Sequence, residues 1–255
     1  MLSIHLLMLS DTHFIIWTTV TFLLAGTVKG VIGSGLPSIS LGLLTALIGL
    51  HPAMTLMLAP TIVTNIWQAV VGGHFRAVVA RIWPFLLMAT VTVWLGAMAL
   101  TRVNVSLLSG LLGVLLALYG VFGLLRPPLV LARGAQTWVG LTAGSINGVF
   151  GGMTGAFAVP GVPYLQALGL QRDQLIQAMG MLFTLSTLSL MLALGGQKLL
   201  SVDLGIASVL AVVPALLGMA LGQRLRRLMS EARFRTVFFA SQIALGGYIV
   251  VRSMV

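Results

Sequence analysis

The sequence predicts an all-α integral membrane protein. Of its 255 residues, 58% are hydrophobic and only 7% are charged, whereas soluble domains carry roughly a quarter charged residues. No Asp, Glu, Lys or Arg occurs between Gly30 and Phe75, a stretch long enough for at least two crossings of about 20 residues each. Because the apolar runs are continuous rather than alternating, they predict helices and not the strands of a membrane barrel.

Charges, prolines and glycine clusters divide the chain into about ten hydrophobic segments. The second and the seventh are short, and each follows a glycine-rich motif, at residues 33–35 and 151–155. We expect broken or re-entrant helices at these two places, and the sequence leaves open whether they cross the membrane fully. The expected segments are 14–33, 36–50, 53–73, 79–100, 105–125, 137–152, 156–170, 174–196, 203–222 and 234–252.

The two halves of the chain resemble each other. Residues 25–33 (AGTVKGVIG) match residues 143–151 (AGSINGVFG), and two shorter matches follow in the same order, 47–50 with 167–170 and 95–100 with 217–221. Five segments in each half is an odd number, so the second half enters the membrane from the opposite side. We therefore predict two inverted repeats, residues 1–128 and 129–255. This organisation is typical of carriers that bind substrate where the repeats meet.

The basic residues predict the orientation of the chain. If all ten segments cross, one face receives far more arginines than the other, and the positive-inside rule places that face in the cytoplasm. Both termini are then expected outside the cytoplasm, in a multi-pass protein of a bacterial-type inner membrane. The net charge of +10 is thus explained by topology, without nucleic acid as a partner. The richer face holds Arg76, Arg81, Arg126, Arg133, Arg172, Arg224, Arg226, Arg227, Arg233 and Arg235, and the other holds Arg102, Lys198 and Arg252.

Lys29 is the ionisable residue that lies well inside an apolar run. A charge within the membrane is costly and is usually retained for function. No acidic residue occurs in the same or the next segment to neutralise it. An uncompensated cation beside a glycine-rich break favours an anionic ligand. The alternative is that the side chain reaches the membrane surface or binds a backbone carbonyl.

The glycines have two interpretations. Gly26 and Gly30, and Gly140, Gly144, Gly148 and Gly152, recur every four residues and predict smooth ridges for close helix packing. The clusters at 33–35 and 151–155 are interpreted as helix breaks. Backbone N–H groups at a helix start bind anions through oriented amides and the helix dipole, and Ser34 and Thr154 add hydroxyl groups there.

Side-chain amides inside the segments are the remaining candidates. Asn65 and Gln68 are three residues apart and share a helical face, and a carboxamide can donate two hydrogen bonds. Asn147 is the repeat mate of Lys29. Each of these amides could instead satisfy a neighbouring helix. The candidate substrate-binding residues are Lys29, Gly33, Ser34, Gly35, Asn65, Gln68, Asn147, Gly151, Gly152, Thr154 and Gln177.

Nothing in the sequence predicts an enzyme. The four histidines lack metal-ligand spacing, the four acidic residues fall near segment ends, and cysteine is absent. No phosphate loop or nucleotide fingerprint occurs. We therefore expect no catalytic residue, no metal and no cofactor.

The glycine motifs at residues 30–37 (GVIGSGLP) and 148–155 (GVFGGMTG) resemble those of the TauE/SafE family, the sulfite exporters or TSUP transporters. The resemblance covers nearly the whole chain. It implies transport of sulfite, of sulfonates such as sulfoacetate, or of other small anions. Thiosulfate-uptake relatives use cysteines, which this chain lacks, so the resemblance implies carriage of the intact anion.

Together these observations predict a secondary transporter of small sulfur-containing oxyanions, sulfite or organosulfonates, that works by alternating access. An inside-negative potential favours the exit of an anion by about 2.3 kcal/mol per charge per 100 mV, so we expect export. A proton-coupled carrier of other small organic anions and an anion channel remain as alternatives. The expected partners are the small anion and the lipid bilayer. Exposed glycine and aromatic faces leave a homodimer open.

Overall fold

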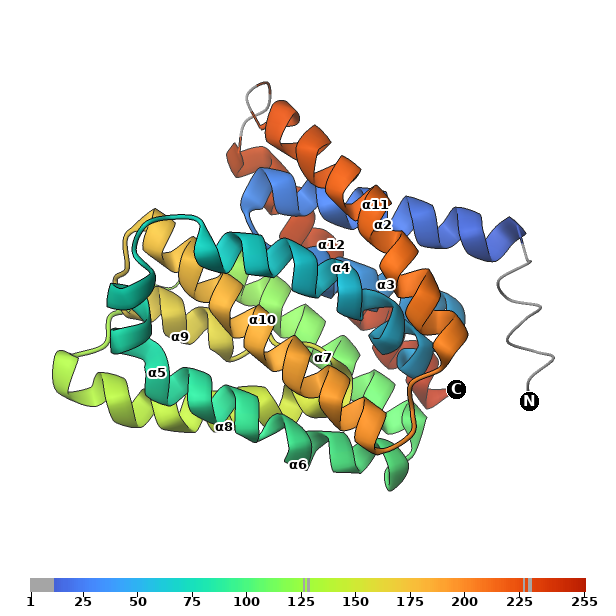
Figure 1. Cartoon of the computed structure of the whole chain (residues 1–255), viewed down its shortest axis with the longest axis horizontal. Helices are drawn as coiled ribbons and strands as arrows, with labels where there is room; N and C mark the ends of the chain where they lie inside the picture. The colour runs from blue at the N-terminus through green and yellow to red at the C-terminus, as the bar shows by residue number, and fades with distance from the viewer. Residues whose placement is uncertain (1–11, 126, 128, 227, 229–230) are drawn as a thin grey trace.

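The computed structural model describes residues 12–125, 127, 129–226, 228 and 231–255, and within these it consists of helices and their connections, without a β-strand (Figure 1). This confirms the all-α prediction. The first half contains α2 (Thr12–Ile32), α3 (Leu36–Ile48), α4 (Leu50–Val70), α5 (Phe75–Val91), α6 (Val93–Ala97), η1 (Met98–Thr101) and α7 (Val105–Leu125). The second half contains η2 (Arg133–Ala135), α8 (Gln136–Thr154), α9 (Gly161–Ala167), α10 (Arg172–Gly196), α11 (Val202–Leu225) and α12 (Glu231–Met254).

Seven helical stretches in the described chain are long and apolar enough to cross a membrane. They are α2, α4, the continuous stretch α5–α6–η1, α7, α10, α11 and α12. The other three expected segments are present as helices but do not meet this standard. Helix α3 has 13 residues, α9 has 7, and α8 has 19 but is less apolar. Because a helix rises about 1.5 Å per residue, α9 covers only about 10 Å. The structure thus supports a multi-pass membrane protein in which seven of the ten expected segments are candidate spans, and the crossing of all ten stays a prediction.

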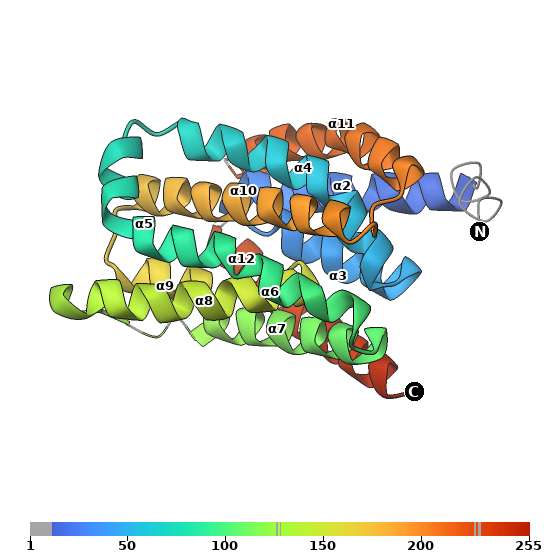
Figure 2. The same cartoon turned by 60° about the horizontal axis from the view of Figure 1, so that its bottom comes forward.

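The long helices run along a common direction, and the connections gather at two ends (Figures 1 and 2). Helix α2 begins, and α12 ends, at the same end of the bundle. The α4–α5, α7–α8 and α9–α10 connections lie at the opposite end, which we call the basic end. Arg126 and Arg227 lie outside the described residues. The described arginines in the elements beside these connections are Arg76, Arg81, Arg133 and Arg172, and Arg224, Arg226, Arg233 and Arg235 flank the α11–α12 connection, which lies at the top of Figure 1.

The main packing partners come from different halves of the chain. Helix α2 packs along α11, α8 packs along α5 and α6, α4 packs on α10, and α7 packs on α12. In Figure 2, α2, α4 and α11 form the upper side of the bundle, and α7 and α8 form the lower side. The two halves of the sequence are therefore interlocked and do not form separate lobes.

Glycines make this interlocking possible. A Cβ atom on Gly26 would lie 2.2 Å from the carbonyl oxygen of Ala215, and one on Gly218 would lie 2.1 Å from that of Leu23. These distances are shorter than those that Cβ atoms make, so the backbones of α2 and α11 touch directly. The same holds between α8 and α5–α6, where a Cβ on Gly152 would lie 2.2 Å from Val93 O. The predicted glycine ridges are confirmed.

The second helix break begins later than the sequence predicts. The first break is where it is expected, with Gly33 and Gly35 at φ +86° and +104° between α2 and α3. In the second half, however, α8 continues through Gly151 and Gly152 and ends at Gly155, at φ +79°. Gly152 packs on α6, and a Cβ on Gly151 would lie 2.0 Å from the Phe157 ring. These two glycines serve close packing, and the break itself covers residues 155–160.

We expect the glycine contacts to be measurable as stability. Gly218→Ala should lower the unfolding midpoint in detergent, because overpacking typically costs about 1–3 kcal/mol. Gly205→Ala, in the same helix, meets no atom within 4 Å and should leave the midpoint unchanged or raise it, since Ala favours helix. Equal midpoints for the two variants would contradict the direct backbone contact.

Candidate functional site

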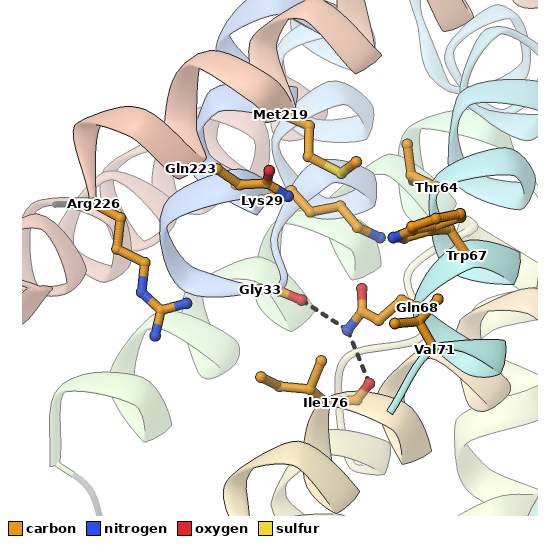
Figure 3. A pocket seen from close by; sticks show the side chains of 11 residues that line it. Lys29, Gly33, Thr64, Trp67, Gln68, Val71, Ile176, Met219, Gln223 and Arg226 are labelled. Carbon is orange, nitrogen blue, oxygen red and sulfur yellow. Dashed lines mark hydrogen bonds between the residues drawn. The ribbon is translucent and has the colours of Figure 1, made fainter. Parts of the chain in front are cut away.

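A cavity of about 610 Å³ lies between the ends of α2, α4 and α11 and the start of α10, toward the basic end (Figure 3). Among the described residues, its walls mix basic, amide and apolar side chains without a carboxylate. The lining residues are Lys29, Gly30, Gly33, Thr64, Trp67, Gln68, Val71, Ile176, Met219, Gln223 and Arg226. The candidate residues Lys29, Gly33 and Gln68 are thus brought to one cavity.

Lys29 lies in the last turn of α2 and is buried, with 4% of its surface exposed. Its Nζ donates a hydrogen bond to Asn65 Oδ1 of α4. Asn65 in turn donates from Nδ2 to the carbonyl of Thr61, at 2.8 Å, which fixes the orientation of its amide. The ammonium is therefore held by a neutral acceptor. A buried cation without a carboxylate partner retains a strong preference for an anion.

Gln68 ties three elements together beside this lysine. Its Nε2 donates to the carbonyls of Gly33 and Ile176, both at 2.9 Å, which joins the end of α2 and the first turns of α10 to α4 (Figure 3). Both amide protons are thereby used. Gln68 consequently shapes the cavity, and its remaining polar atom toward a ligand is the amide oxygen.

The two helix breaks meet at a second, much smaller cavity. About 20 Å³ is enclosed between the start of α3, including Gly35, the Tyr119 ring, Phe183 and residues 156–159. Ser34 Oγ lies 3.4 Å from Tyr119 Oη. This volume is close to what one water requires, and most of its walls are apolar. The breaks therefore face each other, but Ser34 and Gly35 lie apart from the Lys29 cavity.

The candidates on α8 also lie away from the Lys29 cavity. Asn147 Oδ1 accepts a hydrogen bond from the Gly161 backbone at 3.0 Å, whereas its buried Nδ2 has no partner. Thr154 Oγ1 donates to Phe150 O at 2.7 Å and accepts from Ala156 N at 3.2 Å, so it closes the end of the helix. Gly151 and Gly152 make the packing contacts described above.

Gln177 likewise has a structural position. It is fully buried, its Nε2 donates to Ala69 O at 2.8 Å, and its Oε1 accepts from His74 N at 3.1 Å. These bonds fasten α10 to α4 and to the connection that follows α4. Gln177 does not line the Lys29 cavity.

Sequence reasoning missed the part of the cavity that α11 supplies. Met219, Gln223 and Arg226 follow one another at spacings of four and three residues and so share one helical face. The sequence predicts a role for Arg226 only in topology. The sequence signal that could have identified these residues is the polar face at the end of an otherwise apolar segment. Trp67, of which 65% is exposed, is a further lining residue that the candidates did not include.

The arrangement is suited to binding an anion. The lining residues that the structure describes present an ammonium, a guanidinium and two side-chain amides. No group of three His, Asp or Glu side chains comes together in the part of the chain that the structure describes. A polar, cationic cavity between membrane-crossing helices is what an anion transporter requires.

The comparisons with known proteins agree with this chemistry. The sequence model of the family described as sulfite exporter TauE/SafE matches residues 18–249, which include every described residue that lines the cavity. No curated protein and no solved structure matches the chain. The family model matches nearly the whole chain, and the chain forms helices that are long and apolar enough to cross a membrane. The match therefore assigns the chain to this family of membrane transporters. The protein belongs to the sulfite exporter TauE/SafE family.

Proposed function

We propose that this protein exports small sulfur-containing oxyanions, sulfite or organosulfonates, by alternating access, and that the Lys29 cavity is the cytoplasm-facing binding site. The observation that carries the proposal is the buried Lys29 ammonium, held by the neutral Asn65 at the wall of a 610 Å³ cavity. The family contributes the class of substrate, since its members are described as sulfite exporters.

The charge of the cavity supports an anionic substrate. Removing an ammonium from water costs several kcal/mol, and a neutral amide compensates for only part of this. An oxyanion that reaches Lys29 restores the missing interaction through a charge-assisted hydrogen bond. Neutral and cationic solutes gain nothing comparable, so the site selects by the sign of the charge.

The place of the cavity supports loading from the cytoplasm. It lies toward the basic end, which the positive-inside rule assigns to the cytoplasmic side, and Arg226 at the end of α11 lines it. With this orientation, both termini lie outside the cytoplasm. An anion that leaves from here moves down the membrane potential.

The packing pattern supports two inverted repeats, at residues 1–128 and 129–255. The repeats pair α2 with α8, α4 with α10, α5–α6 with α11, and α7 with α12. If each helix is replaced by its counterpart, the contact between α2 and α11 becomes the contact between α8 and α5–α6. The α4–α10 and α7–α12 contacts are reproduced by the same exchange. Two related halves that interlock in this way are expected to give two related cavity states, one open to each side.

The same contacts restrict how the protein can move. Shifting one sequence half against the other would separate α2 from α11 and α8 from α5–α6, where backbones touch at glycines. We therefore assign the moving units to these mixed pairs, each with one helix from either half. Each mixed pair moves as a rigid unit, because its two helices are packed at their backbones. The cavity can then open by movement of one pair relative to another.

Lys29→Met should weaken anion binding. Loss of a charge-assisted hydrogen bond of about 1.5–3 kcal/mol corresponds to roughly ten- to a hundred-fold in affinity. The measurement is the rise in unfolding temperature that sulfite or ethanesulfonate causes in the purified protein.

Lys198→Met is the matched control, because Lys198 is the other lysine of the chain and is exposed between α10 and α11. It should bind as the wild type does, and Lys29→Arg should retain part of the affinity. An unchanged thermal shift in Lys29→Met would remove Lys29 from the site.

Transport should be saturable and driven by voltage. In vesicles that contain the purified protein, 100 mV across the membrane should allow a monoanion to accumulate about fifty-fold without a proton gradient. Flux that rises linearly with concentration would indicate a channel. Uptake that strictly requires a proton gradient would instead indicate a proton-coupled carrier.

A further inference from the structure

The helix that carries Asn65 and Gln68 contains a proline in its interior. Pro60 lies in the middle of α4, and a proline has no backbone N–H to donate. The carbonyl of Leu56, four residues earlier, therefore lacks its usual partner within the helix. Inside a membrane an unpaired carbonyl is costly, because lipid offers no hydrogen bond. The bond that Pro60 removes has to be supplied from outside α4.

Ser208 of α11 supplies this bond. Its Oγ donates to the carbonyl of Leu56 at 2.8 Å and accepts from the backbone N–H of Ala59 at 3.0 Å. The side chain is buried, and α11 packs against α4 on the upper side of the bundle in Figure 2. One hydroxyl group from a neighbouring helix thus pairs with an acceptor and a donor of the α4 backbone, directly before the proline.

The turn that follows Pro60 leads to the partner of Lys29. Asn65 Nδ2 donates to the carbonyl of Thr61, the residue after the proline, at 2.8 Å. Asn65 Oδ1 accepts the hydrogen bond of the Lys29 ammonium. A continuous series of hydrogen bonds and one turn of backbone therefore connects Ser208 with the lysine of the cavity.

We propose that Ser208 is a positioning residue for the anion site: by bonding the interrupted turn of α4, it holds Asn65 where it orients the Lys29 ammonium. This rests on the proposed function. Helix α11 also touches the backbone of α2 beside this lysine, at Gly30. Both α4 and α2 are thereby fixed to α11, which sets how Asn65 and Lys29 meet.

Ser189 provides a matched control. It is also a buried serine that joins two helices, because its Oγ donates from α10 to the carbonyl of Thr90 in α5 at 2.7 Å. Ser189 does not line the Lys29 cavity. The residue four positions after Thr90 is Trp94, which retains its backbone N–H. Comparing Ser208→Ala with Ser189→Ala therefore separates positioning of the site from the loss of a buried hydrogen bond.

Calorimetry with sulfite on the purified full-length protein measures the positioning role. Ser208→Ala should weaken sulfite binding by about three- to tenfold, because Asn65 loses its fixed position. Ser208→Thr keeps the hydroxyl group and should bind sulfite more tightly than Ser208→Ala does. Ser189→Ala should bind sulfite within about twofold of wild type, although both alanine variants should lower the unfolding temperature.

A second-site variant tests whether Pro60 is the reason for the Ser208 bonds. Pro60→Ala returns a backbone N–H to α4, so the Leu56 carbonyl regains a partner within the helix. Ser208→Ala should then lower the unfolding temperature less in the Pro60→Ala background than in wild type. The two changes are expected to be non-additive, because they act on the same carbonyl.

Three results would overturn the inference. Ser208→Ala could bind sulfite within about twofold of wild type, Ser189→Ala could weaken sulfite binding as much as Ser208→Ala does, or Ser208→Ala could lower the unfolding temperature equally in both backgrounds. If Lys29→Met weakens sulfite binding and Ser208→Ala does not, the inference is wrong and the proposed function stands. If wild type binds neither sulfite nor ethanesulfonate, the proposed function is wrong and the inference fails with it.

Discussion

Direct backbone contact between α2 and α11 is the constraint on which the site depends. A Cβ on Gly30 would lie 2.3 Å from the carbonyl of Met219, and Gly30 is the neighbour of Lys29. This contact therefore sets the distance between the lysine and the face of α11 that carries Gln223 and Arg226. Because the two helices come from different halves of the chain, neither half alone contains the cavity.

The polarity of the site follows from what surrounds the lysine. Lys29 and Asn65 are both buried, and the hydrogen bond between them joins a cation to a neutral group. A carboxylate at position 65 would satisfy the ammonium internally and leave little attraction for a ligand. An amide holds the side chain in place and leaves its charge available to an incoming anion.

The positions that the proposed repeats match carry different side chains. Lys29 faces a cavity at the basic end, whereas its counterpart Asn147 is fully buried and bonded to the backbone of Gly161. A carrier with a cation in one half and a neutral amide in the other has unequal affinities for an anion in its two states.

The sequence by itself determined the fold class, the two short helices, the first break, the glycine ridges and the position of Lys29 inside an apolar helix. These features depend on composition and on spacing along the chain, which the membrane constrains strongly. Only the tertiary structure decided that Gly151 and Gly152 pack within α8, that Gln177 fastens α10 to α4, and that Arg226 joins the cavity of Lys29. Lys29 and Arg226 are almost 200 residues apart in the sequence, and their proximity depends on how α2 meets α11. No local pattern encodes such a contact, because the same glycine spacing permits close packing against several neighbours, and the rest of the bundle selects among them.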